Sequence, residues 1–204
     1  MCETYEKQDP RRFSTLETIP RRWQRVQMDM GSWCHPRTKK KFHFLMLVDE
    51  GSRFRMGRIV SYNPANNTTW TTIQQVFTES WLPIFGQPQV LRVDPQGPMM
   101  SNQADQYASE HGIELQPIPA EAHWQISLVE GAIKTTKGMM ETLSAEYPDM
   151  PPAELLGRAI WVMNCRDLFK GYAPLQHALG RCPDDHDHLF ESQRSEERRV
   201  GKEC

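Results

Sequence analysis

The sequence predicts an α/β protein with a mixed five-stranded sheet and helices on both of its faces. Two observations predict this fold class: three strand-like segments follow one another within residues 26–61, and helical and strand-like segments alternate after them. The 204-residue chain is 38% hydrophobic and 25% charged, which is typical of one folded domain and excludes a disordered or disulfide-bonded chain. The predicted element order is βββαβαβαα.

The first three segments are predicted as strands from their apolar patterns. Residues 26–30 alternate apolar and polar side chains, as expected for a strand with one buried face. Residues 42–48 are almost continuously apolar, as in a strand buried on both faces. Residues 49–52 predict a turn, and residues 53–61 predict a third strand running back.

The remaining elements alternate in type. A helix capped by Thr68 or Thr69 is expected to place its apolar residues between Trp70 and Ile84, and Gly86 stops it. Two prolines place the last strand near an edge of the sheet. The residues expected to pack in the core include five tryptophans: Trp23, Trp33, Trp70, Trp81 and Trp161. The further segments are strands at residues 90–94 and 113–118 and helices at residues 102–111, 126–145 and 151–166.

Charge is segregated along the chain. Residues 1–60 carry 13 basic and 7 acidic side chains, whereas residues 61–130 carry one basic and 7 acidic side chains. An enzyme that handles a polyanion needs both signs, with cations for phosphates and carboxylates for a metal, although ordinary variation of surface charge explains the pattern equally well. No apolar run approaches the roughly 18–20 residues that cross a bilayer, so no membrane partner is expected.

Three acidic residues are candidates for chemistry. Asp29 interrupts the first predicted strand, Asp94 ends the fourth, and Glu130 lies early in the long helix, with 35 residues between it and Asp94. Helical spacing places Lys134 and Lys137 on the same helix face as Glu130. Such a face is also typical of an ordinary salt-bridged surface helix.

Five motifs, at residues 22–30, 44–54, 91–97, 124–130 and 171–183, occur in an order that resembles the catalytic core of retroviral and retrotransposon integrases. In this sequence Gly97 stands three residues after Asp94, where the family has two, and Ile126-Ser127 replaces the family's Asn-Gly before the glutamate. The resemblance extends over residues 22–183.

The resemblance implies a ribonuclease H-like fold and a role in DNA integration. The reaction implied is metal-dependent polynucleotidyl transfer, with 3′-end processing and strand transfer of retroelement DNA into target DNA. Asp29, Asp94 and Glu130 would be both catalytic and metal-binding, with Asp29 shared between two Mg²⁺ (or Mn²⁺) ions. Magnesium favours hard oxygen ligands, and paired ions suit phosphodiester transfer.

The same resemblance implies partners and a location. Lys134, Lys137 and Gln125 correspond to positions that contact DNA, Asp49 corresponds to a turn residue, and the protein would act in the nucleus as a homodimer or larger multimer. Two alternatives remain open: a ribonuclease H-like nuclease that cuts without joining, and a catalytically inactive fragment that only binds nucleic acid.

The predicted domain organisation has one folded unit. Residues 22–183 are expected to form the core-like domain with a trailing helical segment, after a linker at residues 1–21. Residues 184–193 are expected to form an acidic tail. Residues 194–204 resemble a translated sequencing adapter, so we expect them to be artefactual.

Overall fold

Five strands form a single mixed sheet in the order β3-β2-β1-β4-β5. The computed structural model describes residues 19–61, 68–95, 97–118 and 127–180. The three N-terminal strands form an antiparallel meander, and the last two run parallel to β1. The predicted sheet is therefore confirmed, with its last strand at an edge. The strands are β1 (Arg25–Cys34), β2 (Lys41–Asp49), β3 (Arg55–Ser61), β4 (Val90–Val93) and β5 (Glu114–Pro117).

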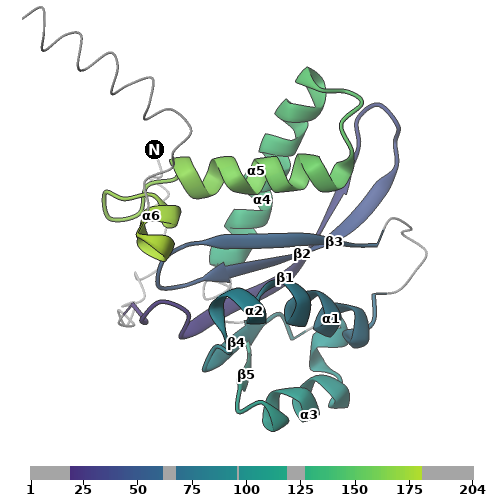
Figure 1. Ribbon diagram of the computed structural model, residues 1–204. Helices are drawn as coiled ribbons and strands as arrows, with labels where there is room; N and C mark the ends of the chain where they lie inside the picture. Colours follow the sequence, from purple (N-terminus) through teal and green to yellow (C-terminus); the bar gives the residue numbers. More distant parts are fainter. Residues whose placement is uncertain (1–18, 62–67, 96, 119–126, 181–204) are drawn as a thin grey trace, which may run out of the picture.

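Helices cover both faces of this sheet, as predicted. Figure 1 shows α4 and α5 on one face and α1 and α3 on the other. In the part of the chain that the structure describes, no helix combines the length and apolar character needed to span a bilayer. The helices are α1 (Trp70–Ser80), α2 (Leu82–Phe85), α3 (Asn102–Glu110), α4 (Ser127–Glu146), α5 (Pro152–Arg166) and α6 (Pro174–Leu179), with a 3₁₀ turn, η1 (Gly97–Met100), before α3.

Alternation along the strands divides the core into two clusters. Val26 and Met28 of β1 belong to the cluster under α1 and α3, together with Leu45 and Leu47 of β2. The alternate residues of β2, Phe42, Phe44, Met46 and Val48, belong to the cluster under α4 and α5. Successive side chains of a strand point to opposite faces, so Gln27 and Asp29 point towards α4.

Three boundaries differ from the predictions by more than one residue. The first strand continues to Cys34, and the third begins at Arg55 because Arg53 has a left-handed backbone (φ 66°) that ends the turn. The helix that begins at Trp70 ends at Ser80, since Pro83 lacks the N–H needed to continue it. Ile84, expected on its buried face, is therefore 61% exposed in the separate helix α2.

Two further expectations meet opposite outcomes. Thr69 is the cap of α1, because its side chain accepts the N–H of Thr72. Trp161, expected in the core, is 45% exposed on α5, so that prediction is wrong. The spacing of apolar residues along a helix does not show which side of the helix other elements will cover. The packing of α5 against β3 determines that Trp161 stays partly exposed.

Candidate active site

The register of two parallel strands brings the first two acids together. Gln27 of β1 pairs with Arg92 of β4, and Met28 pairs with Val93. Asp29 and Asp94 directly follow this last pair, and the charge of Asp94 acts on the Asp29 carboxyl group. Both side chains share the parity of Gln27, so they belong to the sheet face that α4 covers. The parallel pairing thus brings together two acids that lie far apart in the sequence.

The third acid arrives on α4, which is anchored to the same strand. Val129 is fully buried, and its backbone N–H donates to Oε1 of Gln27 at 3.1 Å. Glu130 follows directly and is exposed in the first turn of the helix. The apolar stripe of α4 packs on the sheet through Val129, Ala132, Ile133, Thr136 and Met140.

The carboxyl group of Asp29 has a raised pKa, mainly because it is buried. Burial, helped by the nearby charges of Asp94 and Glu130 and opposed by the Met30 N–H and by Lys137, raises the pKa of Asp29 from 3.8 to about 6. The Met30 N–H donates to Asp29 Oδ1 at 2.6 Å. Within the described residues, the buried Oδ1 of Asp94 has no hydrogen-bond partner.

A groove of about 490 Å³ opens at this edge. Asp29 and Glu130 line it, together with the two lysines that the sequence singled out, Lys134 and Lys137. Asp94 is not part of the lining, and Gln125 lies outside the described residues. The remaining lining residues come from β1 and from the same face of α4: Met30, Ile133, Gly138 and Glu141.

The three acids influence one another electrostatically, but their side chains are not arranged as a metal-binding cluster. Among residues 19–61, 68–95, 97–118 and 127–180, no group of three or more His, Cys, Asp or Glu side chains is placed to hold a metal ion. The chemistry of the donors nevertheless fits a hard divalent cation, because all three are carboxylates and Asp94 presents an unpartnered buried oxygen. A cation between the acids would also relieve the repulsion that raises the pKa of Asp29.

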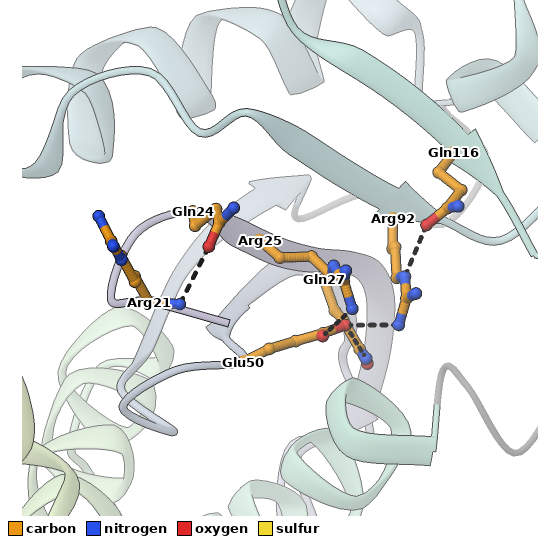
Figure 2. A network of polar contacts seen from close by, with 7 residues as sticks. All are labelled: Arg21, Gln24, Arg25, Gln27, Glu50, Arg92 and Gln116. Atoms are coloured by element: carbon orange, nitrogen blue, oxygen red, sulfur yellow. Dashed lines mark hydrogen bonds and ion pairs between the residues drawn. The ribbon is translucent and has the colours of Figure 1, made fainter. Parts of the chain in front are cut away.

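A buried polar network lies next to the acids, two residues earlier along β1 and β4. Its residues were not among the candidates predicted from the sequence. Its centre is Glu50, whose Oε1 accepts hydrogen bonds from Gln27 at 2.7 Å and from Arg92 at 3.0 Å (Figure 2). A usable signal was present in the sequence: Gln27 and Arg92 each stand two residues before a candidate acid, at inward positions of otherwise apolar strands.

Asp49 pairs with Val26, three register positions away from the pair formed by Asp29 and Met46, and holds a turn together. Its carboxylate accepts the backbone N–H groups of Trp23 (2.9 Å) and Ser52 (2.7 Å) and the Ser52 hydroxyl (2.6 Å). Burial raises its pKa, and these hydrogen bonds oppose the rise. The predicted turn at residues 49–52 is confirmed, and Asp49 is fully committed to it.

Comparison with known proteins rests on structure alone. No protein-family model and no curated protein sequence matches the chain. Two structures of the HTLV-2 integrase catalytic core domain in complex with magnesium, one dimeric and one trimeric, match it with a TM-score of 0.62 and 16% identity. Each match covers 76% of this chain, and 94% and 95% of the respective domains.

The chain has the fold of a retroviral integrase catalytic core. A simian T-cell lymphotropic virus intasome in complex with PP2A regulatory subunit B56 gamma also matches, with a TM-score of 0.67 and 15% identity, over 81% of this chain and 61% of that one. At such identities the likeness establishes the integrase-core fold, and it confirms the ribonuclease H-like α/β architecture expected from the motifs.

Proposed function

We propose that this protein is the catalytic core of an integrase that cuts and joins DNA with divalent metal ions. The observation that carries the proposal is the shared edge: Asp29 and Asp94 directly follow the paired residues Met28 and Val93, and Glu130, whose charge also acts on Asp29, lies on a helix tied to β1. The integrase-core fold supports this choice among the activities that three carboxylates allow.

The three carboxylates would act as ligands to Mg²⁺ or Mn²⁺. When bound, a pair of such ions activates the attacking oxygen and stabilises the leaving oxygen of a phosphodiester. Asp29 must lose its proton before it can bind a metal ion. Because its pKa is raised to about 6, Asp29 is only partly ionised near pH 6. Asp94 offers an oxygen that no other group in the described part of the chain occupies.

The groove would hold the DNA beside these ligands. Lys134 is exposed and Lys137 is half-buried, and both line the groove that contains Asp29 and Glu130. Ammonium groups that line the same groove as the acids could bind the phosphates of a DNA backbone that passes over the site. In the proposed reaction, retroelement ends are trimmed first, and the freed 3′-hydroxyl then attacks target DNA.

Two further parts of the proposal concern assembly and location. Joining two DNA ends requires more than one copy of a single-site enzyme, so we propose a homodimer or larger multimer that acts in the nucleus. The HTLV-2 catalytic core structures in dimeric and trimeric form support the assembly.

The experiment is an oligonucleotide cleavage and joining assay in Mg²⁺ or Mn²⁺. We expect cleavage by the wild-type chain and a loss of about 100-fold or more in Asp94→Asn, because removing one preorganised electrostatic group typically costs 10²–10³ in rate. Glu130→Gln is expected to behave alike. Glu141→Gln is the matched control, since Glu141 lies on the same helix and lines the same groove.

The products distinguish the alternatives. Joined strands would support the integrase, whereas nicks without joined strands would favour a nuclease on the same fold. DNA binding without any metal-dependent cleavage would favour the inactive, nucleic-acid-binding fragment. Equal losses in Glu141→Gln and Glu130→Gln would contradict the assignment of the third acid.

A further inference from the structure

We propose that Gln27 is a positioning residue that sets the place of Glu130 relative to Asp29 and Asp94, and that the buried Glu50–Arg92 pair holds Gln27 in the required orientation. This inference rests on the proposed function. Gln27 contacts the backbone N–H of Val129, so its proposed role is exerted through the backbone at the start of α4.

Gln27 joins a strand to a helix through both ends of its amide. Its Oε1 accepts the Val129 N–H at 3.1 Å, and its Nε2 donates to Glu50 Oε1 at 2.7 Å. Val129 is in the first turn of α4, where backbone N–H groups have no partner within the helix. The glutamine therefore caps α4 from β1 and fixes the peptide that precedes Glu130.

The orientation of this amide is determined by Glu50. An ionised carboxylate only accepts hydrogen bonds, so the NH₂ group of Gln27 must face Glu50 and its oxygen must face the helix. Glu50 is in turn neutralised by Arg92 at 3.0 Å and by Arg25 at 3.3 Å. Gln27, Glu50 and Arg92 are all buried, so each would be costly to leave unpaired.

The network lies on the same face of the sheet as the acids, two residues earlier along β1 and β4. Gln27 and Arg92 are register partners, and each stands two residues before an acid, Asp29 or Asp94. Figure 2 shows Gln27 and Arg92 converging on Glu50 from neighbouring strands, with Gln116 of β5 on the far side of Arg92. One connected set of polar groups thus holds the three segments that carry the acids.

This arrangement explains why a charged pair is buried at this point of the core. Metal ligands must be held to within about 0.5 Å of a productive geometry, and second-layer hydrogen bonds commonly supply that precision. Apolar side chains in place of this network would also fill the core. They would make only non-directional contacts, which would not fix the position and rotation of the first turn of α4. Hydrogen bonds to a strand set both.

The test compares Gln27→Met with wild type in three measurements. Methionine keeps the length and removes the acceptor, so we expect faster hydrogen exchange at the Val129 amide. We expect Mn²⁺ binding, followed by electron paramagnetic resonance without DNA, to weaken about 10–100-fold. In the cleavage assay, kcat should fall while the KM for DNA stays unchanged, because the groove lysines are untouched.

Gln116→Met is the matched control. Gln116 accepts from Nε of Arg92 at 2.7 Å but has no hydrogen bond to α4 in the described structure, so its loss should leave Val129 exchange and Mn²⁺ affinity near wild type. If Gln27→Met fails to fold, Gln27→Asn replaces it, since an amide one methylene shorter cannot span both Val129 and Glu50.

The outcomes separate this inference from the function on which it rests. Faster Val129 exchange with unchanged Mn²⁺ affinity would overturn the positioning role and leave the integrase proposal standing. Unchanged Val129 exchange would overturn the contact itself. Absence of Mn²⁺ binding by the wild-type chain would overturn the metal-dependent function instead. Weakened Mn²⁺ binding in Gln116→Met equal to that in Gln27→Met would also overturn the specific role of Gln27.

Discussion

The two faces of the sheet are built from the same strands but for different purposes. On the face under α1 and α3, β1 contributes Val26 and Met28 to a wholly apolar cluster. On the face under α4 and α5, the intervening residues Gln27 and Asp29 are polar, and apolar packing begins further along the sheet with residues such as Phe44. One strand thus serves the core with every second residue and the candidate site with the others.

The comparison shows where this small domain places its buried polar groups. Large apolar side chains pack on both faces, so both contribute to the burial that stabilises the sheet. The α4 face in addition carries a charged network and an acid with a raised pKa, Asp29. Variants on the two faces should therefore fail in different ways.

The largest effect is expected on the apolar face. Phe77→Ala removes a buried ring between α1 and the sheet, and we expect a loss of about 3–5 kcal/mol in unfolding free energy. Urea denaturation measures it. The exposed Ile84 is the control, with a change below about 0.5 kcal/mol in Ile84→Ala. Similar losses at the two positions would contradict the assignment of Phe77 to the buried core of this face.

A slightly smaller loss is expected from breaking the buried ion pair. Arg92→Met leaves Glu50 incompletely neutralised and should cost about 3 kcal/mol. Adding Glu50→Leu removes the stranded charge, so the double variant should be more stable than the sum of the single losses predicts.

The exposed pair Arg158–Glu154 (2.8 Å) is the control for this cycle. Arg158→Met should cost at most about 0.5 kcal/mol, because exposed ion pairs on helices contribute little. Strictly additive losses at Glu50 and Arg92, measured by the same denaturation, would count against a coupled network.

The ionisation of Asp29 should make a moderate, pH-dependent difference. A pKa raised from 3.8 to about 6 means that the folded state holds the proton more tightly than the unfolded state does. This contribution to stability is complete below pH 3.8 and is lost as the pH rises through 6. At pH 7.5, ionised Asp29 therefore costs about 2–3 kcal/mol.

Asp29→Asn removes that cost, so it should stabilise the metal-free protein by about 1–3 kcal/mol at pH 7.5. The gain should shrink towards zero near pH 4, where Asp29 of the wild-type protein is protonated. Denaturation in the presence of a chelator at both pH values measures it. A gain of equal size at both values would show that burial of charge is not its cause.

The smallest effect concerns DNA binding. Lys137→Glu should weaken binding and lower the salt dependence, the slope of log K against log salt, by about one. Mn²⁺ affinity should change less than DNA affinity. The measurement is fluorescence anisotropy of labelled DNA over a salt series.

Lys40→Glu serves as the control for DNA binding. It lies at a cavity of about 730 Å³ beside the C-terminal end of α4, and the helical rise places that end about 24 Å from Glu130. If both lysine variants lose the same affinity and salt slope, DNA does not select the groove that contains the acids.

Much of the fold was predictable because its signals are local. The alternation in residues 26–30, the apolar run at 42–48 and the Thr69 cap each identify an element from its own residues. The end of α1 was mispredicted because an apolar spacing that continues to Ile84 outweighed the break imposed by Pro83. The exposure of Trp161 depends on which neighbours α5 finds, and no local pattern contains that information.

The candidate site divides in the same manner. The sequence by itself determined the chemistry: three carboxylates at strand and helix ends, two lysines on one helix face, and the motifs that resemble an integrase core. Only the tertiary structure decided that Asp29 and Asp94 follow paired residues of neighbouring strands, and that Gln27 reaches across to the start of α4. The reason is physical: residue type and spacing are properties of the chain, whereas parallel pairing and buried hydrogen bonds arise only when distant segments pack together.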